Sequence, residues 1–563
     1  MSVRAARPRE NVLVRVPDGR SFEGPLGTPL SEAIEAAFPD PPAPIMAAVV
    51  NRELRRLDYT LQGDAEIVPI DTTSNIGMRI YNRAVSFLLV VAANDMYPDH
   101  AVIIDHSVTL GGFYCQIEGM DSLSEQAVCA LEARMHELVA ADEPIGSETL
   151  ELEEARTFFA SQGYDDKVRL LDGLEEKAIV VNTLRGVRDY FYGINASRTG
   201  SLRWFGLEPY ASGLILRLPS RQHPTTLYRR TNYPKMMGVL RDYGRWLGIL
   251  GVEDMGSLNR VVQSDAMREI VLVSEALHEK LISDIADQIV RHDPPAKLVL
   301  IAGPSSSGKT TFSRRLAIQL RVNGLRPFAL GLDDYFVDRD KTPRDAHGEY
   351  DFEALEAINL ALFGEQLLAL MNGEAVPLAH YNFKTGKSER REPVALAKDT
   401  VIIVEGIHGL NPRLIASLPA ERIYRIYVSA LTQLNIDHHN RVPTTDTRLL
   451  RRIVRDARHR GYSARDTIGR WESVRRGEER YIFPYQENAD SMFNSALVYE
   501  MAVIKPLVEP LLLRVPHGTR EGLEAQRLLS FLKWVRPCSA EWVPDNSLLR
   551  EFVGGSILRN FVF

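Results

Sequence analysis

One stretch limits the fold of this chain more than any other. The segment "LVLIAGPSSSGKTTFSRRLAIQL", residues 298–320, runs from an apolar strand through a glycine-bounded loop into a helix. Residues 303–310 match the pattern GxxxxGK[ST] at that strand-to-helix junction, where the mechanism of a phosphate loop requires it. Glycines let backbone N–H groups turn inward, and the following helix presents its positive end. We therefore expect the loop to hold a nucleoside triphosphate, with Lys309 on the β- and γ-phosphates and Thr310 on magnesium.

The surrounding sequence predicts an α/β domain. Four apolar runs, "KLVLIAG", "RPFALGLDD", "TVIIVEG" and "RIYRIYVSA", are separated by helical patterns, which is typical of a parallel sheet. They follow the sequence "DPP" at residues 293–295, where proline ends a helical segment. The boundary of this domain is therefore expected near residue 295.

Length and composition describe the rest of the chain in outline. Its 563 residues predict several domains, and 45% hydrophobic with 25% charged residues is an ordinary globular composition. The net charge of −7 gives no footprint for general nucleic-acid binding. Three scattered cysteines, no leader-like start and a longest apolar run of only ten residues (84–93) predict a cytoplasmic protein without a membrane segment.

A phosphate loop alone does not identify the chemistry, because several classes of nucleotide-binding protein share it. A guanine-nucleotide switch normally carries an NKxD motif, yet the chain contains no Asn-Lys dipeptide. A small-molecule kinase instead needs a carboxylate near magnesium, a base for the acceptor hydroxyl, and cations over the transferred phosphoryl group. Candidates for all three can be found in the sequence.

Two carboxylates lie at the ends of predicted strands. Asp333 in "LGLDDYF" is the candidate base; its neighbour Asp334 is the competitor, since adjacent residues at a strand end point in different directions. Glu405 in "TVIIVEG" ends an apolar run and is followed by glycine, as a metal-side acid would be. Together with Thr310, these carboxylates are expected to surround one magnesium ion.

The cations are expected on a helix within "DTRLLRRIVRDARHRGY", residues 446–462. Its arginines recur at helical spacing and cover one face, while apolar residues take the other. A solvated basic face is the simpler alternative, but beside a phosphate loop we interpret this face as a lid over phosphates. The arginines concerned are Arg448, Arg451, Arg452 and Arg455.

Seven motifs in order, "GPSSSGKTT", "LDDYF", "YDFE", "HYNF", "VEGIHGL", "DTRLLRRIVRDARHRG" and "PYQENADSMFNS", resemble the uridine kinase and phosphoribulokinase family over residues 296–500. The resemblance implies ATP as the phosphoryl donor, magnesium, and a fold like that of nucleoside-monophosphate kinases. It also implies roles for individual residues. These are Asp333, Lys309 and Arg455 in catalysis; Gly303, Ser305, Ser306, Ser307, Gly308, Lys309, Thr310, Thr311 and Arg460 at ATP; Asp351, Tyr381, Phe383 and Arg452 at the acceptor; and Thr310, Asp333 and Glu405 at the metal.

Two positions depart from the family pattern. The histidine that reads the pyrimidine in uridine kinases is replaced by Gly386, and the last arginine of the lid's "RGR" is replaced by Tyr462. A pocket selects its substrate through hydrogen bonds, so uridine itself does not follow from the resemblance. An anionic acceptor met by Lys384, Lys387 and Arg390 is one alternative, and a solvated basic loop is the other.

The N-terminal half predicts α+β modules. Short strands around one helix in residues 1–72 resemble a TGS domain, the β-grasp module that opens threonyl-tRNA synthetases. Residues 73–290 resemble the second additional domain of threonyl- and alanyl-tRNA synthetases, which edits mischarged tRNA, followed by a helical connector. The four metal-type ligands of that domain align with Arg83, Phe87, Phe191 and Asn195, so its editing chemistry is not expected. We expect instead that the domain is retained as a shell for binding or regulation.

We therefore expect a multidomain chain: an α+β N-terminal half, an α/β kinase domain over residues 291–505, and a helical extension over 506–563. The combination resembles a group of bacterial nucleoside kinases. The expected function is ATP- and magnesium-dependent phosphorylation of a nucleoside-like hydroxyl. The alternatives are a sugar or sugar-phosphate kinase of the phosphoribulokinase type and an ATP-switched regulator whose N-terminal half contacts tRNA. A homo-oligomer fits all three.

Overall fold

The first module is a small sheet covered by one helix. The computed structural model describes residues 10–108, 111–120, 122–227, 233–344, 348, 350–382, 384–561 and 563. In the first 71 residues, the strand order is β2-β1-β5-β3-β4, with β1 and β5 parallel and the other pairs antiparallel. Apolar residues at helical spacing in α1 close a core of their own with β1 and β5. The elements are β1 (Asn11–Arg15), β2 (Ser21–Pro25), α1 (Leu30–Ala37), β3 (Ile45–Val50), β4 (Glu53–Arg55) and β5 (Ala65–Asp71).

The second module is built around one buried helix, α2. The Ser74 hydroxyl caps its start by accepting a hydrogen bond from the Gly77 N–H. Among the described helices, α2 alone has the length and apolar composition of a membrane span, but 78% of its most apolar window is buried inside the protein, as in a core helix. Two antiparallel sheets, β11-β12-β7-β6 and β10-β9-β8, complete the module. Its elements are α2 (Asn75–Met96), β6 (Val102–Ser107), β7 (Gly112–Ile117), α3 (Glu125–Ala140), β8 (Gly146–Glu151), α4 (Leu152–Ser161), α5 (Asp165–Leu171), β9 (Ala178–Leu184), β10 (Val187–Tyr190), β11 (Gly206–Tyr210) and β12 (Gly213–Arg217).

Three helices follow: α6 (Pro234–Leu250), α7 (Met255–Val262) and α8 (Met267–Val290). The C-terminal half of α8 packs against the next domain, because Ile282, Ile285 and Ile289 share a core with Val299 and Leu316. The helix that joins the two halves of the chain is thus also a cover for the parallel sheet.

The sheet of the next domain has the order β14-β17-β13-β18-β19, and all of its neighbouring strands are parallel. Four of these strands are the predicted apolar runs; the fifth, β19, is short and was not predicted. The carboxyl ends of parallel strands meet at one edge, where ligands bind in α/β folds. The elements are β13 (Leu298–Ala302), α9 (Lys309–Val322), β14 (Arg326–Gly331), α10 (Leu360–Met371), β15 (Val376–Asn382), β16 (Lys387–Val394), β17 (Thr400–Glu405), β18 (Ile423–Ser429), α11 (Thr444–His459), α12 (Ala464–Tyr481) and β19 (Ser491–Asn494).

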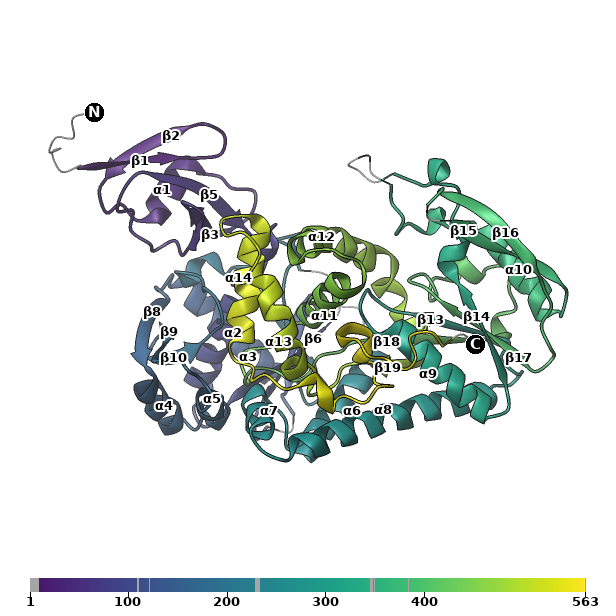
Figure 1. Ribbon diagram of the computed structural model, residues 1–563. Coiled ribbons are helices and arrows are strands. Elements are labelled where there is room, and N and C mark those ends of the chain that lie inside the picture. The colour runs from purple at the N-terminus through teal and green to yellow at the C-terminus, as the bar shows by residue number, and fades with distance from the viewer. Residues whose placement is uncertain are drawn as a thin grey trace.

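The chain ends in α13 (Glu500–Leu512), α14 (Arg520–Leu532) and α15 (Arg550–Val553). Figure 1 shows the first sheet at one end of the molecule, the parallel sheet at the other, and α11 to α14 between them. One apolar core joins side chains of the second module, the connector helices, α11 to α13 and the C-terminal helices. The predicted fold class, an α+β N-terminal half followed by an α/β domain with a parallel sheet, is confirmed, and the modules are fused rather than strung on linkers.

Candidate nucleotide and acceptor site

The glycine-bounded loop joins β13 to α9 at the carboxyl edge of the sheet. A Cβ on Gly303 would lie 1.9 Å from the carbonyl oxygen of Val428 on β18, so a side chain cannot fit there. Gly308 has φ +86°, and Ser306 is also left-handed with φ +59°. The loop conformation therefore depends on close backbone packing against the neighbouring strand.

Lys309 begins α9 and folds back over the loop. Its Nζ donates to the carbonyl oxygens of Gly303 (2.9 Å) and Pro304 (3.1 Å). Burial lowers the pKa of Lys309, while the carboxylates of Glu405 and Glu551 act in the opposite direction. The ammonium group is thus positioned inside the loop, where it can reach phosphate oxygens.

The next residue meets the predicted metal-side acid. The Thr310 hydroxyl donates to Glu405 Oε1 at 2.8 Å, because β13 and β17 are parallel neighbours and both end at this edge. Burial raises the pKa of Glu405. A hydroxyl and a carboxylate are hard oxygen ligands that suit Mg²⁺, which takes few protein ligands and otherwise binds phosphate and water. Among the described residues, no group of three or more acidic, histidine or cysteine side chains forms a complete metal cage.

The two adjacent aspartates point in different directions. Asp333 lines the same cavity as Lys309 and Thr310. Asp334 instead accepts from His380 Nδ1 at 2.8 Å and lies 3.7 Å from Arg391. The surrounding protein raises the pKa of Asp333 through desolvation, although its carboxylate stays open to solvent in the cavity. Of the pair, Asp333 alone is available to an acceptor in this cavity.

The cavity has a volume of about 390 Å³ and brings most of the predicted residues together. Gly303, Thr311, Asp351 and Tyr381 do not line it, and Phe383 lies outside the described residues. Tyr381 is buried beside Phe336, with ring centroids 5.6 Å apart, so it supports a cavity wall from behind. The predicted residues in the lining are Ser305, Ser306, Ser307, Gly308, Lys309, Thr310, Asp333, Glu405, Arg452, Arg455 and Arg460.

The arginines of α11 divide into two groups. Arg452, Arg455 and Arg460 line the cavity, and all three lie within 4 Å of the Asp456 carboxylate. Arg448 and Arg451 are 1% and 0% exposed and do not belong to a lid surface. The expectation of one basic face is therefore wrong for these two, because the helix lies against the loop and buries that part of the face.

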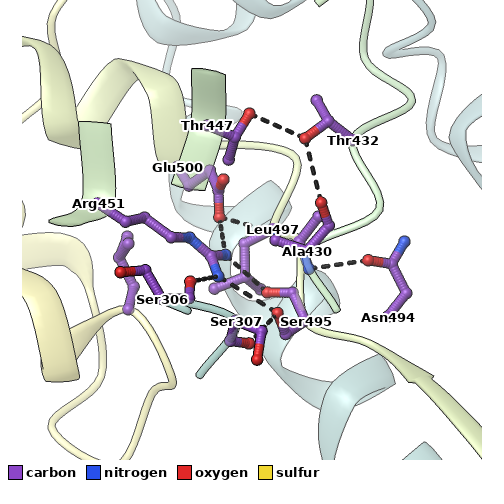
Figure 2. A network of polar contacts seen from close by, with 12 residues as sticks. Ser306, Ser307, Ala430, Thr432, Thr447, Arg451, Asn494, Ser495, Leu497 and Glu500 are labelled. Carbon is purple, nitrogen blue, oxygen red and sulfur yellow. Dashed lines mark hydrogen bonds and ion pairs between the residues drawn. The ribbon is translucent and has the colours of Figure 1, made fainter. Parts of the chain in front are cut away.

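The buried arginines hold the loop from behind. Arg448 Nε donates to the Ser305 carbonyl at 3.1 Å, and Arg451 Nη1 donates to the Ser306 carbonyl at 3.4 Å. Figure 2 shows how the Arg451 guanidinium joins the loop to Ser495 and Glu500. The carbonyl groups of Ser305 and Ser306 are thus bound by arginines of α11, which holds the loop in place beside the cavity.

Several residues of the cavity were missed by sequence reasoning. Glu478 on α12 accepts from the Ser305 N–H at 3.0 Å and also pairs with Arg448. Glu551 on α15 accepts from the Thr311 N–H (3.2 Å) and hydroxyl (2.9 Å). Both belong to helices far along the chain, and no local motif marks them. Phe336, Phe352, Glu353 and His408 also line the cavity.

The two positions that depart from the family pattern, Gly386 and Tyr462, have local structural roles. Gly386 is in the β15–β16 turn with φ +70°, and a Cβ there would lie 2.9 Å from the Arg339 side chain. Tyr462 is 37% exposed and packs under Arg470. Neither position lines the cavity, so neither supplies a base-reading group.

In the second module, the four positions aligned with the synthetase metal ligands do come together. Phe87 and Phe191 pack edge to face with ring centroids 5.4 Å apart. The Arg83 guanidinium donates to the Ile194 carbonyl, and Asn195 is fully buried. The shell is retained, but phenylalanine cannot bind a metal, so these residues cannot perform the editing chemistry by that route.

Comparison with known proteins agrees with this division of the chain. Residues 298–501 match the model of the Phosphoribulokinase / Uridine kinase family. Threonine–tRNA ligases match over another part: that of Halorhodospira halophila is 30% identical over 201 residues (35% of this chain, 31% of the ligase), and that of Syntrophomonas wolfei 25% over 261 residues (44% and 41%). The chain thus spans less than half of these ligases. A solved D-glycerate 3-kinase from Cryptococcus neoformans is 18% identical, covering 38% of this chain and 88% of its own, with a TM-score of 0.24.

Residues 298–501 thus match the P-loop kinases of the uridine kinase and phosphoribulokinase family, and the N-terminal half is similar to threonine–tRNA ligases. This is the family combination that the motifs predicted.

Proposed function

We propose that the chain transfers the γ-phosphoryl group of ATP to a hydroxyl of a nucleoside-like acceptor. One observation carries this proposal: Asp333 lies in the same cavity as Lys309 and Thr310, while Asp334 is held by His380. A protein that only binds nucleotide as a switch needs no carboxylate at the acceptor side. A kinase needs one to accept the hydroxyl proton.

The residues divide the work of transfer between them. The loop N–H groups and Lys309 would hold the β- and γ-phosphates, and Thr310 with Glu405 would hold magnesium, which supplies charge stabilisation between phosphate oxygens when bound. Asp333 would take the proton from the acceptor oxygen; its raised pKa makes it a better base than an ordinary aspartate. The arginines that line the cavity would balance the negative charge on the phosphoryl group in the transition state; they are Arg452, Arg455 and Arg460.

The acceptor side favours a molecule with a flat ring. Phe336 and Phe352 line the cavity with centroids 5.7 Å apart, and Ile358 adds apolar surface. His408 beside them is buried, and burial lowers its pKa to about 4. Its neutral imidazole could both donate to and accept from a nucleobase edge. We therefore prefer a nucleoside acceptor, with His408 as a group that reads its base.

A sugar or sugar-phosphate acceptor is the second candidate, supported by the three arginines in the cavity. The basic hairpin gives it less support: Lys387 lies 3.3 Å from Asp338 and 3.6 Å from Asp340, and β16 is exposed along nearly its whole length. A third candidate is a regulator that binds tRNA, and the argument for it is the synthetase-like N-terminal half. This candidate is tested by measuring tRNA binding at several salt concentrations, because phosphate contacts weaken steeply as salt rises.

The proposal is tested by ADP release from magnesium-ATP with a panel of nucleosides, sugars and sugar phosphates. Asp333→Asn should lower acceptor-dependent kcat by about 10²–10⁴-fold, as expected for loss of a general base. Asp334→Asn is the matched control, since it makes the same change one residue away at a side chain that faces His380. Equal activity of Asp333→Asn and the unchanged chain, or no acceptor that raises ADP release, would refute the proposal.

A further inference from the structure

Another cavity lies between the N-terminal half and the kinase segment, and several polar side chains line it. It measures about 200 Å³ and shares no lining residue with the nucleotide cavity. Its walls come from α2, β6, β7 and residues 191–192 of the second module, from the loop that precedes α11, and from Arg527 on α14. An adjoining cavity of about 460 Å³ shares Asn82, Phe113 and Arg441 with it. A ligand could therefore extend beyond the smaller space.

Four arginines line this cavity, and two of them have counter-charges. Arg79 and Arg527 both pair with Asp446, at 3.1 and 2.7 Å, and with Glu524, at 2.8 Å each. Together these four side chains form a closed network with two positive and two negative charges. They need no further partner.

The other two arginines, Arg83 and Arg441, have no counter-charge within the described part of the chain. Arg83 donates to the Ile194 carbonyl and lies over the Tyr192 ring at 5.5 Å. Arg441 donates to the Val442 carbonyl at 3.4 Å and lies over the Phe113 ring at 5.1 Å, and its Nε has no hydrogen-bond partner in the described part of the chain. Neither is paired with a carboxylate among the described residues. Burial lowers the pKa of both, that of Arg83 to about 10. A guanidinium group does not lose its proton in proteins, so both side chains carry a positive charge.

A buried histidine and the oxygen atom of a half-buried amide add unused hydrogen-bonding groups. The side chain of His439 is 1% exposed, and its Nδ1 lies 2.6 Å from Asp189 Oδ2, which fixes the ring. Its Nε2 has no partner among the described residues, and neither does Asn82 Oδ1 in the same cavity wall. Buried polar groups in native proteins nearly always have a partner. Unsatisfied groups that share one cavity with two unpaired cations indicate a ligand.

We propose that this cavity binds a small molecule through a carboxylate or phosphate group, with Arg83 and Arg441 as the paired cations. Arg83 and Arg441 are half-buried, and a guanidinium group that is partly removed from water without a counter-charge costs free energy. An oxyanion that reaches both would form charge-assisted hydrogen bonds with them. His439 and Asn82 would bind the remaining polar groups of the molecule. The cavity volume limits the part bound here to a few functional groups.

The site can be located directly with tungstate, an analogue of phosphate that scatters anomalously. Crystals of the full chain soaked in tungstate should show one peak at the phosphate loop and a second beside Arg83 and Arg441. Lys309→Ala should remove the first peak alone, and Arg441→Gln the second alone. The absence of the second peak in the unchanged chain, or its persistence in Arg441→Gln, would overturn the proposal.

A solution measurement excludes effects of crystallisation and separates the two anion types. At constant ionic strength, inorganic phosphate or acetate is added to the Lys309→Ala chain, and the melting temperature is recorded. The anion that fits should raise the melting temperature by at least about 1 °C, and Arg441→Gln should abolish this rise. Arg134→Gln is the matched control, because Arg134 pairs with Asp95 and Glu137 outside the cavity.

The same variant distinguishes a binding role from a structural one. Without an added anion, Arg441→Gln should melt at or above the temperature of its parent, because the change removes a half-buried charge that has no carboxylate partner among the described residues. A lower melting temperature would show that Arg441 is needed for folding. That result, or equal stabilisation of both chains by phosphate and acetate, would contradict the proposed site.

Discussion

At the scale of single residues, the nucleotide cavity distinguishes adjacent residues of the same type, because only one of the two faces it. Asp333 faces the cavity and Asp334 faces His380, although their side chains are chemically identical. Likewise, Thr310 meets Glu405, while the next residue, Thr311, meets Glu551. The role of each residue at this site therefore depends on the direction in which its side chain points more than on its residue type.

The raised pKa of Asp333 predicts the pH dependence of turnover. A carboxyl group acts as a base only when ionised, so activity should fall as pH falls through the pKa of Asp333. Because desolvation raises that pKa above its ordinary 3.8, the acid limb should lie at a higher pH than for an exposed aspartate. The measurement is kcat/KM between pH 4 and 8. Asp333→Glu should displace the limb, and an unchanged limb in that variant would assign it to another group.

At the scale of elements, α11 carries out two tasks with one set of arginines. Arg448 and Arg451 face inward and bind loop carbonyls, whereas Arg452 and Arg455 face the cavity. All four arginines lie on one face of α11, so what separates them is the neighbour that each meets: the loop carbonyls for Arg448 and Arg451, and the open cavity for Arg452 and Arg455. The same helix therefore holds the loop in place and places cations in the nucleotide cavity.

This division predicts different outcomes for two similar substitutions. Arg451→Met should lower the free energy of unfolding by about 3–5 kcal/mol, because Glu500 would remain buried without its partner. Arg455→Met should change stability little and lower kcat instead. Urea unfolding and steady-state kinetics on both variants make the comparison.

A double variant is the control for this interpretation. Arg451→Met combined with Glu500→Leu removes both buried charges, and it should recover part of the lost stability. If the double variant is less stable than Arg451→Met alone, the ion pair does not explain the loss.

At the scale of the whole molecule, the two halves share a core. Side chains of the second module, α6 to α8, α11 to α13 and the C-terminal helices pack into one apolar cluster. The first sheet differs, since its central cluster contains residues of its own strands and helix. The halves of this chain are therefore expected to fold as one unit, with the first module as an addition.

Truncation tests this expectation. A chain starting at residue 73 should fold with a lower melting temperature, because it loses the apolar contacts that Met46, Ala47, Leu54 and Ile70 make with the core of the second module. A chain starting at residue 291 should aggregate, since it loses α8 and exposes the apolar face of the sheet beneath it. Soluble yield and circular dichroism melting are the measurements. A monomeric, cooperatively melting 291–563 fragment would show that the kinase segment is independent.

Much of the nucleotide site could be predicted from sequence because its parts are local. The glycine-bounded loop, Lys309 and Thr310 lie within one strand-to-helix junction, and Asp333 and Glu405 each end an apolar run. Parallel strands bring such ends to one edge, so the strand pattern also predicted their meeting. For the same reason the fold class could be predicted from the four apolar runs.

What only the tertiary structure decided is the set of contacts between distant segments. Glu478 and Glu551 reach the loop from helices about 170 and 240 residues further along the chain, and β19 joins the sheet as a short fifth strand. Arg83 and Arg441 line one cavity from two different parts of the chain. No periodicity or motif predicts these contacts between distant segments. The spacing of side chains within an element determines which residues share a face, but not what packs against that face. The sequence by itself determined the phosphate loop and the parallel sheet. Packing decided which arginines are buried, which line the nucleotide cavity, and which lack a partner between the two halves.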